Sequence, residues 1–209
     1  MPQSLLKPDS RIYYEMMSHP AIFMHAKPQK IALVSDAEAL LEEVLKHPNL
    51  LEVYCITQKS PAKKNQKSRV IYHSDTSLPQ KSLLNTFDII ILDKAYEPKA
   101  LQQYFSLLHE KGILVQPANS PFDVETLQSL QKNLRLLPMT DMHIVSFPEP
   151  TFPLGWRSLV LSLKQGAFSR IREKDIFNKP FATHYYNLDT HRAALAVPEF
   201  MRKKLGERT

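Results

Sequence analysis

Short apolar runs alternate with amphipathic segments along most of the chain. Residues 30–34, KIALV, are apolar and partly β-branched, and residues 88–93, DIIILD, are almost continuously apolar between two acids. Such runs are typical of strands in a parallel sheet that is covered on both faces. Further apolar runs predict strands at 51–56, 69–73, 113–115, 141–147 and 157–163.

The amphipathic segments predict helices between these strands. Residues 37–47, AEALLEEVLKH, gather four aliphatic side chains on one face, and Pro48 ends the segment. Ser35 and Asp36 precede it, and either side chain is suited to cap the first turn.

Two more helices are predicted further along the chain. Pro98 begins one that runs to about His109, where Lys111 and Gly112 close it, and residues 123–134 form the other. Strands that alternate with helices imply a parallel sheet with right-handed crossovers. The last two predicted strands have no helix between them, so we expect them to pair antiparallel.

The predicted fold class is therefore α/β, with a methyltransferase-like Rossmann fold. Its sheet is doubly wound and mostly parallel, with an antiparallel C-terminal hairpin. Residues 1–26 form an N-terminal segment, and residues 27–209 form one globular α/β domain. Ligands of such sheets bind beyond the carboxyl ends of the strands. The turn after the first strand, the end of the second strand and Asp93 are therefore candidate site positions.

Glycine is scarce, with four residues in 209 and none before Gly112. An ordinary chain has about 7% glycine, so the turns of the first half must rely on proline, asparagine, aspartate and serine. The single cysteine, Cys55, lies in an apolar run and is expected to be a buried, inert thiol. A reducing cytoplasm is then the simplest compartment. No apolar run is long enough for a membrane span, and the N-terminus lacks a secretory signal pattern.

The formal net charge is +6, and residues 59–69 contribute five basic side chains without an acid. This segment is either a solvated loop or an electrostatic site for nucleic acid or an acidic partner. Aromatic residues do not alternate with the basic ones, so the segment lacks the pattern of a stacking platform for single strands, and no nucleic-acid partner is expected. The eight histidines have no metal-ligand spacing, so no metal is predicted.

Several segments together resemble one enzyme family. They are RIYYEMMSHP (11–20), DIIILD, YFSLLHEKGILVQPANSPF (104–122), PTFPLGWRSLVLSLK (150–164) and THYYNLDTHRAALAVPEF (183–200). In order and spacing they are similar to the spermidine synthases, the polyamine aminopropyltransferases. The resemblance implies transfer of an aminopropyl group from decarboxylated S-adenosylmethionine to putrescine in polyamine biosynthesis. It implies no cofactor, with decarboxylated S-adenosylmethionine as co-substrate. The family's small N-terminal β-domain is expected to be missing.

The family's donor-binding positions are altered in this sequence. Its glycine-rich GGGDGG turn falls at residues 35–39, where side chains restrict close backbone approach. The acid that ends its second strand falls near Thr57, where there is none. Asp36 and Glu38 are candidates to hold the donor, or are ordinary acids at a helix N-terminus. Asp75 is the candidate acid on the adenine side.

The resemblance also places a candidate base. The family's DSSDP motif falls at residues 93–97, and its first acid survives as Asp93. Asp93 is either the catalytic base or a cap of the next element. The second acid of the motif aligns with Tyr96, and the neighbouring Glu97 is a candidate substitute. Lys94 introduces a cation where a dication should bind.

The remaining acceptor-site candidates are aromatic. Tyr13 and Tyr14 fall at the family's YHE motif, and they are either substrate contacts or aromatic residues at the rim of the core. Phe152 replaces the tyrosine of the PTYP motif, so the ring is kept and the hydroxyl is lost.

Two functions remain open from the sequence. The first is a divergent aminopropyltransferase with a degenerate active site, whose partners are small polyamine and nucleoside ligands. The second is a catalytically inactive relative that acts as a binding or regulatory module. A homodimer is compatible with both.

Overall fold

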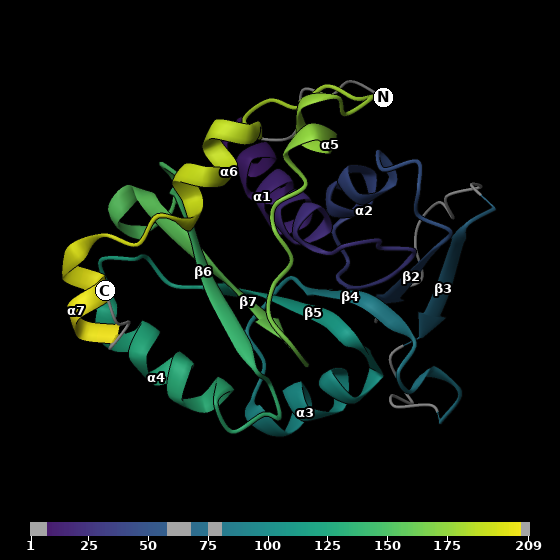
Figure 1. The fold of residues 1–209 in the computed structure, drawn as a ribbon, viewed down its shortest axis with the longest axis horizontal. Helices are drawn as coiled ribbons and strands as arrows, with labels where there is room; N and C mark the ends of the chain where they lie inside the picture. Colours follow the sequence, from purple (N-terminus) through teal and green to yellow (C-terminus); the bar gives the residue numbers. More distant parts are fainter. Residues whose placement is uncertain (1–7, 58–67, 75–80, 206–209) are drawn as a thin grey trace.

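A single seven-stranded sheet forms the centre of the molecule (Figure 1), seen in a computed structural model that describes residues 8–57, 68–74 and 81–205. The strand order is β3-β2-β1-β4-β5-β7-β6. The strands are β1 (Lys30–Val34), β2 (Glu52–Thr57), β3 (Val70–Ser74), β4 (Phe87–Leu92), β5 (Leu108–Ala118), β6 (Asp141–Pro148) and β7 (Trp156–Leu163).

Helices cover both faces of this sheet, as Figure 1 shows, with α1, α2, α5 and α6 on one side and α3 and α4 on the other. α7 packs beside α4. The helices are α1 (Pro8–Met24), α2 (Glu38–Leu45), α3 (Pro98–Leu107), α4 (Val124–Leu134), α5 (Glu173–Phe177), α6 (Leu188–Leu195) and α7 (Glu199–Leu205). Two short 3-10 turns, η3 (Lys81–Leu83) and η4 (Pro153–Gly155), complete the described elements.

Strand pairing confirms the predicted fold class. β1 pairs in parallel with β2 and β4, β2 with β3, and β4 with β5. The hairpin of β6 and β7 is antiparallel, and β7 also pairs antiparallel with β5. The predicted central strand, DIIILD, is the middle strand of the seven. Its apolar side chains are buried on both faces, as the continuous apolar run indicated.

Two of the predicted helix boundaries are wrong. Neither Ser35 nor Asp36 caps α2, because the helix begins at Glu38 and the residue before it, Ala37, makes no side-chain cap bond. The Ser35 hydroxyl instead accepts a hydrogen bond from the Ala37 backbone N–H at 2.9 Å. This bond closes the turn after β1 one residue before the helix starts.

Gly112 lies inside β5 and does not close α3. α3 ends at Leu107, β5 starts at Leu108, and the pairing with β4 shifts register between Phe87 and Ile89. A Cβ at Gly112 would lie 2.9 Å from the Phe87 carbonyl oxygen. Glycine is therefore required here by the close approach of two strands, rather than by a helix end.

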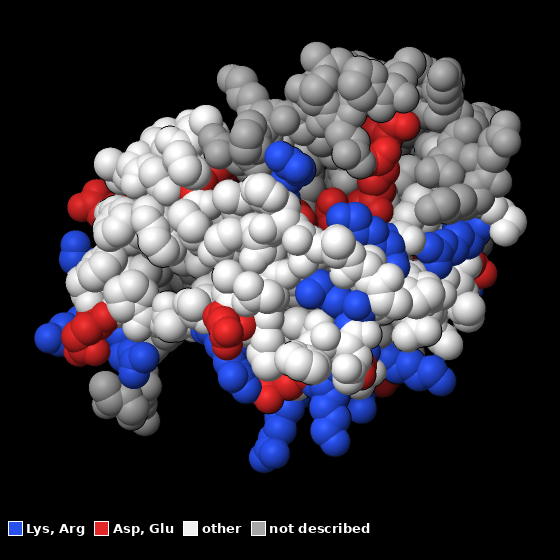
Figure 2. All heavy atoms as spheres, turned by 90° about the horizontal axis from the view of Figure 1, so that it is seen from above, with Lys and Arg blue, Asp and Glu red and all other residues white. Residues whose placement is uncertain are grey.

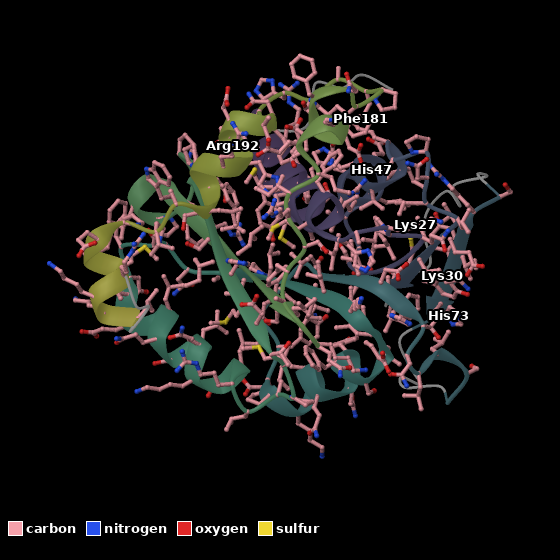
Figure 3. All side chains as sticks on the ribbon, viewed as in Figure 1. Lys27, Lys30, His47, His73, Phe181 and Arg192 are labelled. Carbon is pink, nitrogen blue, oxygen red and sulfur yellow. The ribbon has the colours of Figure 1, made fainter. Side chains whose placement is uncertain are left out.

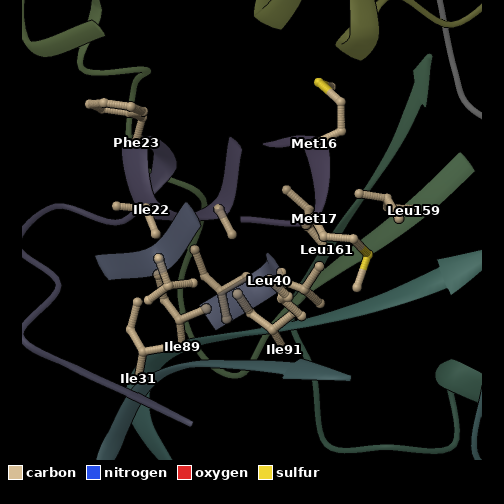
Figure 4. Packing of buried hydrophobic residues seen from close by; sticks show 14 of the residues in the cluster. Met16, Met17, Ile22, Phe23, Ile31, Leu40, Ile89, Ile91, Leu159 and Leu161 are labelled. Atoms are coloured by element: carbon tan, nitrogen blue, oxygen red, sulfur yellow. The ribbon is translucent and has the colours of Figure 1, made fainter. Parts of the chain in front are cut away.

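The helix α1 was not predicted, and it is a major part of the core. Met16, Met17 and Ile22 are almost fully buried against strands β1, β4 and β7 (Figure 4). α1 also contacts α2 and runs along the same face of the sheet. The part of residues 1–26 that the structure describes thus packs against the α/β domain.

The positive charge is dispersed on the face of the molecule that Figure 2 presents. Lys and Arg side chains there are separated by uncharged and acidic residues and do not join in one patch. Most of the basic segment 59–69 lies outside the described residues. Among the helices that the structure describes, none is long and apolar enough to cross a membrane.

Candidate functional site

A small cavity of about 230 Å³ opens at the carboxyl ends of β1, β2 and β4. Parallel pairing places Val34 beside both Ile56 and Leu92, so the turns that follow these strands meet at one edge of the sheet. We call this the carboxyl edge. The cavity is lined by Val34, Ser35, Asp36, Ile56, Asp93, Lys94 and Tyr96.

Asp93 is one of the residues that line the cavity, and it is held through its backbone. Its backbone N–H donates to the Val34 carbonyl at 3.3 Å, and its carbonyl accepts from the Tyr13 hydroxyl at 3.3 Å. Both bonds leave the carboxylate available to a ligand. A carboxylate held in this way meets the geometric condition for a general base, which is hydrogen-bond reach of a proton to be removed.

Asp36 is a second acid among the residues that line the cavity. It accepts a hydrogen bond from the hydroxyl of Thr57, which ends β2. The carboxylate from the β1 turn thus lies at the end of the neighbouring strand. This is the strand end at which the resembled family has an acid and this sequence has none.

The turn that carries Asp36 has an ordinary backbone. Ala37 has a φ of −83°, and the only described non-glycine residues with positive φ are Asn85 and Leu154. The turn at residues 35–39 therefore uses no left-handed conformation. Its side chains occupy the space beside the strand ends, and a ligand here must bind to side chains as well as to backbone.

Arg157, which was not a candidate from the sequence, contacts two of the candidate aromatic residues, Tyr13 and Phe152. The guanidinium carbon of Arg157 lies 4.0 Å from the ring centre of Tyr13 and 4.7 Å from that of Phe152. Its Nη1 also lies 3.3 Å from a carboxylate oxygen of Glu149, which is 8% exposed. Tyr13, Arg157 and Phe152 therefore form one stack that comes from α1, β7 and the turn before η4. Only the tertiary fold brings them together, so local sequence patterns gave no signal.

The two predicted tyrosines differ in burial. Tyr13 is 8% exposed, and Tyr14 is half-buried. Burial, opposed by the charge of Arg157 and assisted by that of Asp93, raises the pKa of Tyr13 to about 12. Burial and then the Asp93 charge also raise the pKa of Tyr14. Both hydroxyls therefore stay protonated and lie within the field of Asp93.

The other candidate residues lie outside this cavity or outside the described chain. Glu38 and Glu97 are exposed at the starts of α2 and α3, and neither lines the cavity. Asp75 lies outside the described residues. Phe152 and the two tyrosines lie beside the cavity and not in its wall.

Lys94 adds a positive charge to the cavity wall. Its ammonium lies 5.3 Å from the ring centre of Tyr96, within the range of a cation–π contact. The cavity therefore combines two carboxylates with one ammonium. No group of three potential metal ligands occurs among the described residues.

Curated relatives are similar over almost the whole chain. A polyamine aminopropyltransferase of Halorhodospira halophila is 30% identical over 224 aligned residues, covering 95% of this chain and 81% of the relative. Another, from Alkalilimnicola ehrlichii, is 29% identical over 225 aligned residues, covering 95% and 79%. No family model matches the sequence.

Solved structures show the same fold. A spermidine synthase from Thermotoga maritima superposes with a TM-score of 0.79 at 22% identity, covering 96% of this chain and 76% of that one. A spermidine synthase in complex with the transition-state analogue AdoDATO gives a TM-score of 0.80 at 20% identity, covering 96% and 77%.

Proposed function

The chain belongs to the polyamine aminopropyltransferase family, and from that membership we propose that it transfers an aminopropyl group from decarboxylated S-adenosylmethionine to putrescine. The observation that carries this proposal is that two acids, Asp36 and Asp93, line the same carboxyl-edge cavity. Both substrates are cations, so two acids in the lining of the cavity favour their binding.

In the proposed reaction, the amine nitrogen of putrescine attacks the propyl carbon of the donor. The C–N bond forms while the C–S bond of the sulfonium breaks, and its electron pair stays on sulfur, so neutral methylthioadenosine leaves. Asp93 accepts the proton that the nitrogen releases. The backbone bonds of Asp93 to Val34 and Tyr13 support this role, because they hold the base in place while reactants are aligned.

We further propose that Asp36 holds the donor ribose in place of an acid at the end of β2. Its carboxylate already binds a hydroxyl at that strand end, that of Thr57, and a ribose hydroxyl offers the same donor. The glycine-free turn then defines a reshaped donor site. Tyr14 and Glu97 remain candidates for the acceptor side.

The test is product formation from decarboxylated S-adenosylmethionine and putrescine, followed by mass spectrometry. We expect spermidine and methylthioadenosine from the unaltered protein, and a fall in kcat of about 10²- to 10⁴-fold in Asp93→Asn. Glu110→Gln, an exposed change at the start of β5, is the matched control and should retain full activity. Absence of product, or equal rates in Asp93→Asn and Glu110→Gln, would refute the proposal.

The second candidate is a non-catalytic relative that binds small molecules, and Lys94 favours it. An ammonium in the cavity wall opposes a dicationic acceptor. Thermal-shift titration with methylthioadenosine, together with Lys94→Ala, separates the two. Tight nucleoside binding without turnover, and no gain of activity in Lys94→Ala, would support the binding role.

A further inference from the structure

A larger cavity, of about 620 Å³, lies at the opposite edge of the sheet. It is formed by the residues just before β1 (26–29), those just before β2 (47–51) and a C-terminal segment within 172–181. Because β1 and β2 are parallel, their amino ends share this edge, which we call the amino edge. It is therefore separated from the candidate active site by the length of the strands.

A hydrogen-bonded relay of buried side chains ends in this cavity. The Nε2 atom of His19 lies 3.1 Å from a carboxylate oxygen of Glu43, and its Nδ1 lies 2.9 Å from Nε2 of His47. His47 lines the cavity. Lys46 pairs with Glu43 at 2.7 Å, which keeps that carboxylate as an acceptor only.

This geometry fixes the tautomers of both histidines. Since the Glu43 carboxylate can only accept, His19 carries its proton on Nε2, and its Nδ1 accepts the Nε2–H of His47. Burial lowers the pKa of His19 to about 3 and that of His47 to about 2, so both rings are neutral. His47 is left with a lone pair on Nδ1, which has no hydrogen-bond partner among the described residues. Because His47 lines the cavity, this free acceptor suits a ligand that donates an N–H or O–H.

The charged side chains of the cavity are mainly cationic. Arg172 is committed to the protein, because it donates to the carbonyls of His25 and Ile22 and pairs with Asp175. Lys27 and Lys179 also line the cavity and form no ion pair with any described residue. An anion is therefore the ligand that the unpaired charges favour.

The remaining walls are apolar and partly aromatic. Phe181 packs edge-on against His47 with ring centres 4.8 Å apart, and Phe23 does so at 5.1 Å. Figure 3 shows Phe181 and His47 close together, with Lys27 further along the same side of the molecule. Such walls bury a flat ring favourably, and the cavity volume is in the usual range for small organic ligands.

We propose that the amino-edge cavity binds a small aromatic anion: its acid group pairs with Lys27 and Lys179, its ring packs against Phe181, and a ring N–H or O–H donates to Nδ1 of His47. The polyamine and sulfonium substrates of the proposed reaction are cations and do not match this site. The proposal therefore does not depend on catalysis at the carboxyl edge.

Four probes separate the features of the ligand in calorimetric titrations of the full chain. 4-Hydroxybenzoate has the acid, the ring and the O–H donor. Benzoate lacks the donor, 4-hydroxybenzyl alcohol lacks the charge, and acetate lacks the ring. We expect 4-hydroxybenzoate to bind saturably at one site per chain, and benzoate to bind about fivefold more weakly. The alcohol and acetate should bind more weakly still.

Variants locate the site. Lys27→Gln combined with Lys179→Gln should weaken 4-hydroxybenzoate at least about tenfold. Lys132→Gln, an exposed lysine on α4 outside the cavity, is the control and should change nothing. Lys27→Arg with Lys179→Arg should restore binding. Absence of saturable binding up to about 10 mM, equal binding in the double glutamine variant, or competition by methylthioadenosine would each overturn the proposal.

Discussion

At the carboxyl edge, Asp36 is exposed and Asp93 is half-exposed, and both side chains face a cavity. At the amino edge, His19 and His47 are buried and hydrogen-bonded to each other, and His19 also bonds Glu43. The first set of side chains contributes little to packing, so it can change while the fold is kept. The second set is part of the packing, so its replacement must cost stability. The two edges of the sheet thus differ in how far their polar side chains are built into the packing of the fold.

The largest expected effect is at the amino edge. His19→Ala removes a fully buried side chain and leaves the Nε2–H of His47 without its acceptor. We expect the free energy of unfolding to fall by about 3 kcal/mol, which urea denaturation measures. Asp93→Ala, made as the matched change at the carboxyl edge, should alter it by no more than about 0.5 kcal/mol. Similar losses of unfolding free energy in both variants would refute this difference between the two edges.

The next effect is a dependence of stability on pH. The pKa values of His19 and His47 are lowered by burial from 6.5 to about 3 and about 2. Below about pH 6.5 the unfolded chain therefore binds more protons than the folded protein does. The stabilisation is present above pH 6.5 and is lost as the pH falls. Between pH 6.5 and about 5.5, each histidine should reduce the free energy of unfolding by about 1 kcal/mol.

His191 adds a contribution of the same sign, because burial lowers its pKa to about 4. Urea denaturation across this pH range measures the total. In His19→Ala the loss on acidification should be smaller by about 1 kcal/mol, since one titrating group is gone. Identical pH dependence in this variant and the unaltered protein would show that the buried pair does not control acid stability.

The smallest expected effect on stability is at Asp36, the residue of the carboxyl edge that we propose holds the aminopropyl donor. Asp36→Ala should change the free energy of unfolding by no more than about 0.5 kcal/mol, but weaken methylthioadenosine about five- to tenfold. Thr57→Val keeps the carboxylate and removes its present hydroxyl partner, so it should leave this affinity equal or higher. If Thr57→Val weakens binding as much as Asp36→Ala, Asp36 positions the turn and does not contact the nucleoside.

The strands could be predicted from the sequence because each is an apolar run bounded by polar residues. The helix α1 could not, because its buried face includes Glu15, Ser18 and His19, and Pro20 interrupts it. The Ser18 hydroxyl donates within the helix, whereas Glu15 and His19 are satisfied by distant partners. The Glu15 carboxylate, for example, accepts hydrogen bonds from the backbone N–H groups of residues 184–186. A local hydrophobic pattern does not contain such contacts.

The candidate site was only partly predictable for a related reason. The rule that ligands bind at carboxyl strand ends identified Asp93 and the turn that contains Asp36, and both residues line one cavity. It did not reveal that Asp36 bonds Thr57, or that Arg157 stacks between Tyr13 and Phe152. These are contacts between segments far apart in the chain, and they depend on tertiary geometry that spacing does not encode.

The glycine-free turn after β1 also has a consequence for the unfolded chain. A residue with a side chain has fewer backbone conformations to lose on folding than glycine has, which stabilises the folded state by about 0.4–1 kcal/mol per position where φ is compatible. Residues 35–39 meet that condition, since none of them has positive φ. The side chains of this turn restrict close approach to its backbone. The same side chains make its ordering cost less conformational entropy than that of a glycine-rich turn.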